Sequence, residues 1–448
     1  MEIKKQIKPI LFFILILFFA TYQDFPLVNR FGEIARSPMV FVAPFMLVYI
    51  FSHKKIVFSK YLSYWISYVL YLTILSFICL YIVKTINGSI YVFYENLFIK
   101  TLKMLVYPTV GIIFYQFVYS VLKQLKNPLY VVFHALLLLQ LFTICWLVFE
   151  IYYLKKPIEF MSFIHAKPQK YWRVRLWTLE ESWTGTILIL LTIFPMYFLY
   201  KLKLYKWKKA LTIFASIAIF VSYVVVSESK GFLVLVMVCV LPLAFQFINK
   251  HKYLRQLSFI LGGIILILFA VAVINLREVI FDQFNNSITF GTRFTSIYAA
   301  IDVFIKSYIG VGYSGFVYFY PLSIETAMNS GVFDGFNLQE IKAYLSTTKA
   351  LSTKSEFFDN LIYGGLVYLY FFYKFFIQRY YYLSKIPKQE LYFIRIPFLF
   401  IILAGIIYIT YHIKYEVWFF LAFLDFVVTE YYQKHVESAI QEKRNISS

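Results

Sequence analysis

The chain has 448 residues, of which 61% are hydrophobic and 22% aromatic, while only 15% are charged. Since about a quarter of the residues in a typical soluble domain are charged, this composition excludes an ordinary soluble enzyme and indicates a membrane protein with many spans. The net charge of +20 would suggest nucleic-acid binding in a soluble protein. Here the lysines and arginines stand in short clusters between apolar runs, which is typical of topology signals, so we expect no nucleic-acid partner.

Twelve apolar runs are long enough to cross a hydrocarbon core, which takes about 17 to 25 residues of helix. In chain order they cover residues 8–23, 36–52, 61–83, 97–122, 129–153, 184–200, 209–227, 231–249, 256–274, 357–377, 393–411 and 415–432. The first run could pass for a signal peptide, but no small-x-small cleavage site follows it, so we expect an uncleaved helix. The predicted fold is all-α, with residues 1–448 forming one polytopic integral membrane domain whose span centres are nearly free of charge.

Basic clusters fall on alternate connections between these runs. They are Lys4/Lys5/Lys8, residues 53–55, Lys123/Lys126, residues 201–209, residues 249–255, Arg379/Lys385/Lys388 and residues 434–444. All seven lie on one side when twelve spans are threaded, and short basic loops stay in the cytoplasm. We therefore expect both termini to be cytoplasmic and two long connections, residues 155–183 and 275–356, to face outward.

The first long outward loop ends in a segment that carries arginines and glutamates just before a membrane helix. The segment reads Tyr171-Trp172-Arg173-Val174-Arg175-Leu176-Trp177-Thr178-Leu179-Glu180-Glu181-Ser182-Trp183. Arg173 and Arg175 are candidates for binding phosphate, because the planar guanidinium donates paired hydrogen bonds without losing its charge. The alternative is an interfacial aromatic belt with snorkelling arginines.

The turn Ser227-Glu228-Ser229-Lys230-Gly231 opens the eighth apolar run. Its amides and Lys230 offer a cationic element at a helix N-terminus, where anions bind readily. A plain polar cap is the alternative.

The second long outward loop contains Arg293 and, after an amphipathic stretch, the segment Gly310-Val311-Gly312-Tyr313-Ser314-Gly315-Phe316. Three glycines in six residues predict a turn that can bring backbone N–H groups close to a ligand anion, although an ordinary loop bend has the same signature. Asp359 lies at the membrane edge of the tenth run, where an ionisable group usually marks a site or a salt bridge. Its alternative role is a carboxylate at a positive helix end.

Several common site types are missing from the sequence. Cys79, Cys145 and Cys239 each lie inside an apolar run without a CxxC spacing, which indicates neither a disulfide framework nor a metal site. The absence of HExxH, GxSxG, Walker-type and DxD motifs argues against an ATP-driven pump and a metal-dependent transferase, so we expect no metal and no cofactor. His165 and His412 could each act as a base, but we expect both at the surface.

At these residues the chain resembles the O-antigen polymerase and O-antigen ligase superfamily of bacterial envelope proteins, and the polymerase branch more closely. The likeness covers the architecture of most of the chain and four local patterns. Arg175 to Gly185 resembles the family's Arg-then-Glu-Pro-Ser stretch, with Ser182 and Trp183 in place of Pro-Ser, and Ser227 to Gly231 resembles its Ser-x-Ser-Arg/Lys-Gly turn. Arg293 with Gly310 to Phe316 resembles the family's Arg followed by Gly-x-Gly-x-Gly-Phe. Asp359-Asn360 with Gly364 resembles its Asp/His-Asn helix start. The loop histidine typical of ligases is absent, which argues against a ligase and against a histidine-based mechanism.

The resemblance implies a metal-independent glycosyltransferase of the bacterial inner membrane that makes O-antigen, capsule or exopolysaccharide. Its donor would be an oligosaccharide on undecaprenyl pyrophosphate and its acceptor a sugar hydroxyl of a second lipid-linked repeat, with membrane lipids, a chain-length regulator and a flippase as further partners. The residues we expect to act fall into three groups: Arg173 and Arg175 on one pyrophosphate; Arg293, Lys230, Gly312 and Tyr313 on the other; and Glu181 or Asp359 as the base.

Two other functions would suit a chain with about twelve spans. A lipid-linked oligosaccharide flippase or other secondary transporter should have charges buried mid-span and broken, repeat-related helices. An O-antigen ligase would attach the glycan to a different acceptor.

Overall fold

The computed structural model describes residues 2–52, 58–154, 164–166, 174–227, 229–250, 286–349, 351–386 and 389–447. Within these ranges the fold is almost entirely helical, which confirms the predicted all-α class. The exception is one short antiparallel hairpin of β1 (Tyr91–Val92) and β2 (Glu95–Asn96), in which Tyr91 pairs with Asn96.

The helices follow one another with short connections. The N-terminal part contains α1 (Glu2–Thr21), α2 (Val28–Phe31), the 3-10 helix η1 (Glu33–Arg36), α3 (Met39–Phe51), α4 (Lys60–Asn87), α5 (Leu97–Gln124) and α6 (Pro128–Tyr152). The middle part contains the 3-10 helix η3 (Glu181–Thr184), α7 (Gly185–Thr192), α8 (Phe194–Lys201), α9 (Lys206–Ser227) and α10 (Lys230–Lys250). The C-terminal part contains α13 (Ile288–Lys306), α14 (Gly312–Asn329), α15 (Gln339–Ala343), α16 (Glu356–Phe372), the π-helix η4 (Tyr373–Ile377), α17 (Gln378–Lys385), the 3-10 helix η5 (Gln389–Leu391), α18 (Tyr392–Ile407) and α19 (Tyr415–Ser447).

In the described part of the chain, 8 helical segments are long and apolar enough to cross a membrane. They are Lys60–Asn87, Leu97–Gln124, Pro128–Tyr152, Ser182–Lys201, Lys206–Ser227, Ile288–Lys306, Glu356–Lys385 and Gln389–Ile407. All but Ile288–Lys306 coincide with predicted runs, which agrees with a multi-span helical membrane protein. The run predicted at 256–274 lies outside the described residues, and the total of twelve spans stays a prediction.

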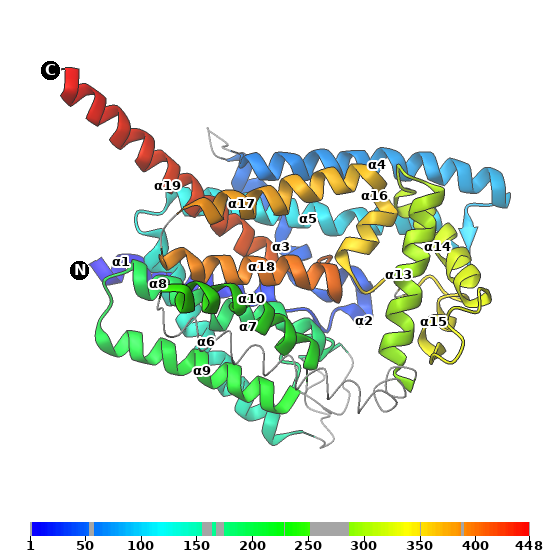
Figure 1. The fold of residues 1–448 in the computed structure, drawn as a ribbon, viewed down its shortest axis with the longest axis horizontal. Helices are drawn as coiled ribbons and strands as arrows, with labels where there is room; N and C mark the ends of the chain where they lie inside the picture. Colours follow the sequence, from blue (N-terminus) through cyan, green and yellow to red (C-terminus); the bar gives the residue numbers. More distant parts are fainter. Residues whose placement is uncertain are drawn as a thin grey trace.

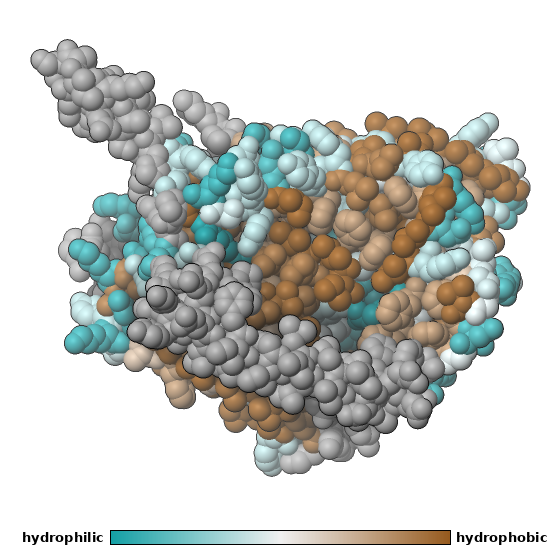
Figure 2. Space-filling model, in the orientation of Figure 1, coloured by the Kyte–Doolittle hydropathy of each residue, from teal (hydrophilic) through white to brown (hydrophobic). Residues whose placement is uncertain are grey.

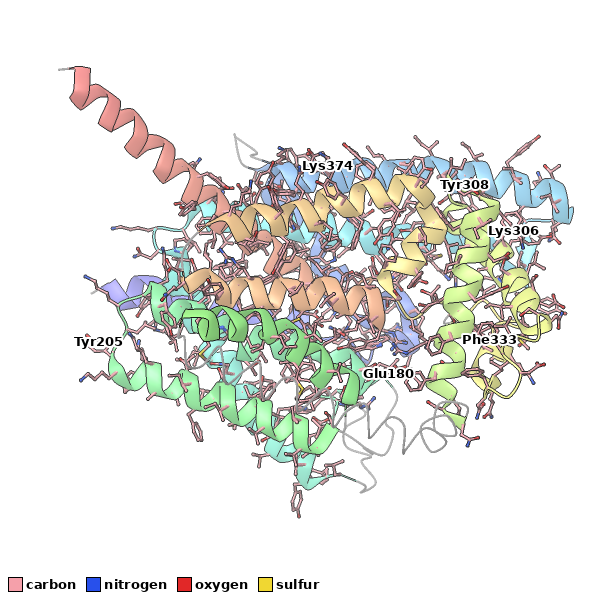
Figure 3. All side chains as sticks on the ribbon, viewed as in Figure 1. Glu180, Tyr205, Lys306, Tyr308, Phe333 and Lys374 are labelled. Carbon is pink, nitrogen blue, oxygen red and sulfur yellow. The ribbon has the colours of Figure 1, made fainter. Side chains whose placement is uncertain are left out.

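The two ends of the helix bundle differ. In Figure 1, α4, α9 and α18 run side to side across the view, and both chain termini lie at the left end. The basic connection between α8 and α9, marked by Tyr205 in Figure 3, lies at that same end. At the other end lie the β-hairpin, α14 and α15, and α13 crosses the bundle nearly perpendicular to α4 and α18. The termini and the basic α8–α9 connection therefore lie at the end of the bundle opposite α13, α14 and α15.

α16 is kinked where it packs against the glycine-rich segment before α14. Gly365 has φ 54° and ψ −136°, outside the helical region, and a Cβ there would lie 2.1 Å from the carbonyl oxygen of Tyr308. The amide of Leu366 donates to that oxygen at 2.8 Å, and the amide of Val311 donates to the carbonyl of Ile362 at 2.9 Å. The glycines thus let two backbones touch, and the contact directs the first turns of α16 toward the end of the bundle that carries α13.

Candidate functional site

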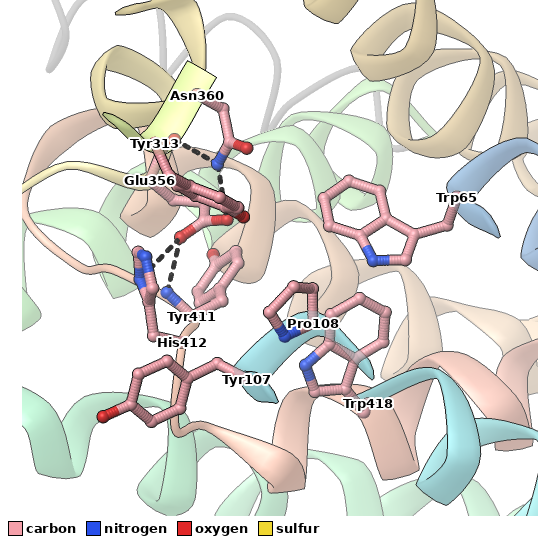
Figure 4. A pocket seen from close by; sticks show the side chains of 9 residues that line it. All are labelled: Trp65, Tyr107, Pro108, Tyr313, Glu356, Asn360, Tyr411, His412 and Trp418. Atoms are coloured by element: carbon pink, nitrogen blue, oxygen red, sulfur yellow. Dashed lines mark hydrogen bonds and ion pairs between the residues drawn. The ribbon is translucent and has the colours of Figure 1, made fainter. Parts of the chain in front are cut away.

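A pocket opens where α16 starts, among residues from five elements and one connection. It is lined by Trp65 of α4, Tyr107 and Pro108 of α5, Tyr313 of α14, Glu356 and Asn360 of α16, Tyr411 and His412 of the α18–α19 connection, and Trp418 of α19. It holds about 310 Å³ of empty space, part of it open to the outside. Figure 4 shows Trp65 and Trp418 on one side and Glu356, Asn360 and His412 on the other, with Tyr313 and Tyr411 beside Glu356.

Glu356 is the central polar group of the pocket, with a side chain only 11% exposed. One carboxylate oxygen, Oε2, accepts a hydrogen bond from the amide of Tyr411 at 2.7 Å, and the other, Oε1, accepts one from Nδ2 of Asn360 at 2.7 Å. Nδ1 of His412 lies 3.8 Å from Oε2. Two neutral donors and one titratable ring therefore fix the carboxylate in place.

The start of α16 is held by the end of α18. Ser355 caps α16, because its hydroxyl accepts from the amide of Phe358 at 3.4 Å, and it also donates to the carbonyl of Ile406 at 2.8 Å. The amide of Glu356 donates to the carbonyl of Ile409 at 2.8 Å. The i,i+4 spacing of Glu356 and Asn360 places both on one helix face, and Oδ1 of Asn360 accepts from the hydroxyl of Tyr68 at 3.0 Å.

His412 is half-buried, and its ring packs edge-on to that of Tyr107 with centroids 6.0 Å apart. Burial lowers the pKa of His412, although the negative charge of Asp359 acts in the opposite direction. The imidazole is therefore neutral near pH 7 and can accept a proton. The prediction that His412 lies on the surface is wrong, because tertiary packing brings the α18–α19 connection into the pocket.

Lys414 fixes the far end of the same connection. Its ammonium group is almost fully buried and donates to the carbonyl of Trp183 at 2.8 Å and to Oε1 of Gln23 at 3.0 Å. Gln23 in turn donates to Glu416 at 2.9 Å. This polar network ties the connection to α1 and η3, so His412 sits on a segment held at both ends.

Asp359, a predicted catalytic carboxylate, lies behind the pocket rather than in its lining. It is fully buried, and it accepts hydrogen bonds from the amide of Thr353 at 2.7 Å and from the hydroxyl of Ser352 at 2.9 Å. Its contacts hold the strand of chain that leads into α16, and its charge acts on His412. The described geometry gives Asp359 a positioning role.

Two cations, Arg293 of α13 and Lys354 before α16, contact or adjoin segments that line the pocket. Nη1 of Arg293 donates to the carbonyl of Ile407 at 3.0 Å, and its guanidinium lies 5.8 Å from the ring centre of Tyr408. Lys354, two residues before Glu356, forms an ion pair of 3.1 Å with Glu340. Both cations therefore lie where the α18 end and the α16 start meet.

Glu180 connects the two long loops electrostatically. Burial alone would lower the pKa of Lys354, but Tyr344, Glu180 and Glu340 together raise it above its ordinary value. The negative charge of Glu180 also acts on the guanidinium of Arg293. A charge of the first long loop therefore acts on cations of both α13 and the segment before α16.

Arg175 lies in a different cluster. Its Nη1 donates to the carbonyl of Leu179 at 2.9 Å and lies 3.6 Å from Oδ2 of Asp24. The same Oδ2 lies 2.9 Å from Nδ1 of His165, which is 1% exposed, so the prediction of a surface position for His165 is wrong. The described contacts of Arg175 thus anchor the first loop to the chain just after α1.

Three other predicted site residues cannot be placed by their side chains. Arg173 lies outside the described residues. Glu181 opens η3 and Lys230 opens α10, but their side chains lie outside the described part of the structure.

The glycine-rich turn packs α14 onto α4. Gly312 has φ +60°, and a Cβ there would lie 2.7 Å from the Cα of Ser76. The amide of Tyr313 donates to the Ser76 hydroxyl at 2.8 Å, and the ring of Tyr313 lines the pocket. Gly312 thus permits close backbone contact, while the Tyr313 amide that we expected to face an anion bonds to Ser76.

The sequence analysis missed Glu356, Asn360, Lys354 and Glu180 as site residues. Two of these residues could have been identified from the sequence, because Glu356 and Asn360 form a polar i,i+4 pair at the start of an apolar run. Among the described residues, no group of three or more His, Cys, Asp or Glu is placed to hold a metal ion.

Comparisons with known proteins return no match: no family model fits the chain, and no curated protein matches it. The functional argument therefore rests on the pocket itself.

Proposed function

We propose that this protein is a membrane glycosyltransferase that polymerises lipid-linked oligosaccharide repeats. It would move glycan from an undecaprenyl pyrophosphate donor to a sugar hydroxyl of a lipid-linked acceptor. The observation that carries the proposal is the Glu356–His412 pair in an aromatic pocket flanked by Arg293 and Lys354. This set supplies a base, a sugar-sized apolar wall and cations for a phosphate leaving group.

The base must remove the proton of the acceptor hydroxyl as its oxygen attacks the anomeric carbon. A neutral His412 imidazole can accept that proton, and the Glu356 carboxylate 3.8 Å away stabilises the resulting imidazolium. The bond between the anomeric carbon and the pyrophosphate oxygen breaks as the new glycosidic bond forms. We therefore assign general-base catalysis to this pair, in place of the predicted Glu181 or Asp359 and in reversal of the sequence-based argument against a histidine mechanism.

The leaving pyrophosphate needs its developing negative charge to be stabilised. Arg293 offers a fork of donors on the pocket side of α18, and Lys354 keeps its positive charge because its neighbours raise its pKa. Preorganised cations at a developing anion are a large catalytic contribution when water is excluded. They allow the transfer to proceed without a nucleotide cofactor.

The aromatic wall suits a sugar ring. Trp65 and Trp418 lie across the pocket from the polar groups, and Tyr107 packs against His412. Binding sites of this kind combine a mainly apolar lining with a few placed polar groups that fix orientation. A pyranose can pack its C–H face on these rings while one hydroxyl points to His412.

A transporter is the second candidate, because two observations favour it. Arg379 and Asp425 form a buried ion pair with Nε 3.1 Å from Oδ1, and Asp425 also accepts from the hydroxyls of Ser59 and Tyr115. Asp425 lies inside the predicted run 415–432, whereas Arg379 lies just after the predicted run 357–377. The kinked α16 is a broken helix of the sort transporters use. We rank this function second, since the aromatic pocket has a base and cations that transport does not require.

The test uses purified protein in liposomes with lipid-linked repeats extracted from cells that lack this protein. Glycan length on the lipid is measured by gel after the repeats are labelled. A ladder of multiple repeats is the expected result, and it should collapse to single repeats with Glu356→Gln but persist with Glu325→Gln, a matched change at an exposed glutamate of α14. Transbilayer movement without bond formation would assign a transporter, and one transfer to an unrelated lipid would assign a ligase; both would overturn the proposal.

A further inference from the structure

α13 exposes large apolar side chains along one face. Their exposed fractions lie between 38% and 57%, and the set is Phe290, Phe294, Tyr298, Ile301 and Ile305. At about 3.6 residues per turn, spacings of three and four place these side chains in a single stripe. The stripe covers nearly the whole length of the helix.

The opposite face of α13 is small and buried. It consists of Gly291, Thr292, Thr295, Ser296, Ala299, Ala300 and Val303. A Cβ at Gly291 would lie 2.3 Å from the carbonyl oxygen of Asn337, and the hydroxyl of Thr292 donates to Glu340 at 3.2 Å. These contacts fix the rotation of α13, so the apolar stripe cannot turn inward. A helix in water has the reverse pattern, with its large apolar residues buried.

The stripe continues onto the exposed surface of α16. The chain after α13 exposes Tyr308 by 56% and Ile309 by 61%, and the backbone hydrogen bond from Leu366 to Tyr308 joins this segment to Leu366, itself 53% exposed. Figure 2 shows hydrophobic residues gathered in the region of α16 and α13. A contiguous apolar surface of this kind would be costly in water and marks an interaction site.

The orientation of α13 decides what covers this surface. α13 crosses the end of the bundle nearly perpendicular to α4 and α18 in Figure 1. Its length and composition would allow it to span a membrane, but a helix perpendicular to the spans cannot cross the same bilayer. Helices that lie in a membrane surface have one apolar face and cations placed to reach headgroups, and α13 has Arg293 next to Phe294 and a Lys306 side chain that is 60% exposed.

We infer that α13 lies in the plane of the membrane at the boundary between headgroups and acyl chains, with the Phe294–Ile305 stripe in contact with lipid. This contact goes beyond the proposed function and does not depend on it. It also places Arg293 at the depth of lipid phosphates, where a lipid-linked pyrophosphate would lie.

The test is spin labelling in liposomes, in a background with Cys79, Cys145 and Cys239 replaced by alanine. Single cysteines are introduced by Phe294→Cys, Ile301→Cys and Ile305→Cys, with Glu325→Cys on the exposed polar side of α14 as the matched control. The collision rates of each label with oxygen, which dissolves in lipid, and with a water-soluble nickel chelate give its depth. Each variant must elute from size exclusion as the parent protein does.

The inference requires three results. The α13 labels should collide more often with oxygen than with nickel, the Glu325→Cys label should show the opposite, and the three α13 depths should agree within a few ångströms. A spanning helix would instead give depths that differ by about 16 Å between positions 294 and 305, at 1.5 Å per residue. The inference would be overturned by that depth gradient or by labels that collide more often with nickel than with oxygen. It would also be overturned by labels protected from both reagents that show dipolar coupling between two copies of the protein.

Discussion

The carboxylate of Glu356 and the imidazole of His412 lie 3.8 Å apart, although 55 residues separate them in the chain. The backbone hydrogen bond from the amide of Glu356 to the carbonyl of Ile409 joins the start of α16 to the α18–α19 connection, and so it brings Glu356 close to His412. Local sequence does not bring these two side chains together. The pair is a product of how α16 and α18 pack.

The first prediction concerns pH. The ordinary pKa of histidine is 6.5, and burial lowers that of His412. The base form of His412 therefore persists to lower pH than in an exposed histidine, and protonation of His412 should lower polymerisation only below pH 6.5. The measurement is the pH dependence of kcat/KM for elongation in liposomes. An acidic limb centred above 6.5 would contradict a buried, neutral His412.

The same shift affects stability, with a defined sign. Because folded His412 binds its proton less readily than unfolded His412, the folded state loses stability as the pH falls through the unfolded value. His412→Gln should reduce this acid sensitivity. Melting temperatures in detergent at pH 7.5 and pH 5.5 should differ less for the variant than for the parent, whereas an equal difference would show that His412 does not contribute.

The second prediction concerns Arg293. Replacing it by alanine should lower elongation about 100-fold, the usual loss when one donor to a developing anion is removed, and Arg293→Lys should restore only part because lysine lacks the paired donors. Arg30→Ala, at an exposed arginine of α2, is the control and should elongate normally. The measurement is the elongation rate of each variant at saturating substrate. Equal rates for Arg293→Ala and Arg30→Ala would show that Arg293 does not act in the site.

The third prediction concerns the kink of α16. Gly365→Ala should prevent folding, because the new Cβ would lie 2.1 Å from a carbonyl oxygen and the backbone there has a positive φ. Gly88→Ala shares a positive φ of +67° but meets nothing within 4 Å, so it should cost only about 1–2 kcal/mol. Recovery of monodisperse protein from membranes compares the two. Equal recovery would mean that α16 does not depend on this close contact.

The fourth prediction concerns the buried Arg379–Asp425 pair. Removing one partner leaves a buried charge unpaired, which costs about 3–5 kcal/mol, so Arg379→Met and Asp425→Leu should each destabilise the protein strongly. The double variant should recover much of that loss, since it removes both charges. Unfolding by SDS in mixed micelles gives the three free energies. Additive losses in the double variant would show that the two groups do not form a coupled pair.

The helices were predictable from sequence because apolar runs are a local property, and α4, α5 and α6 match theirs closely. The stretch around α13 was harder, since it was predicted only as an amphipathic part of the second long outward connection. Its stripe at Phe294, Ile301 and Ile305 was nevertheless visible in the sequence. Only the structure shows that the small polar residues face inward and the large apolar ones outward.

The candidate site was predictable in part. Arg293, Tyr313 and the start of α16 were found by residue type and position, and they lie in or beside the pocket. Glu356 and His412 were not paired, because their contact depends on tertiary hydrogen bonds between α16 and the α18–α19 connection. Arg175 was predicted to bind one pyrophosphate because of its residue type, whereas in the structure it lies 3.6 Å from Asp24.

The central claim is that the Glu356–His412 pair activates an acceptor hydroxyl for glycan transfer. The most direct measurement is the single-turnover rate of repeat addition in liposomes for Glu356→Gln, with Glu325→Gln as control. Glu356→Gln keeps the size of the side chain but removes its charge, so the rate should fall about 100- to 10,000-fold while the variant remains folded and binds lipid-linked repeats. A folded Glu356→Gln variant that adds repeats at the parent rate would contradict the claim.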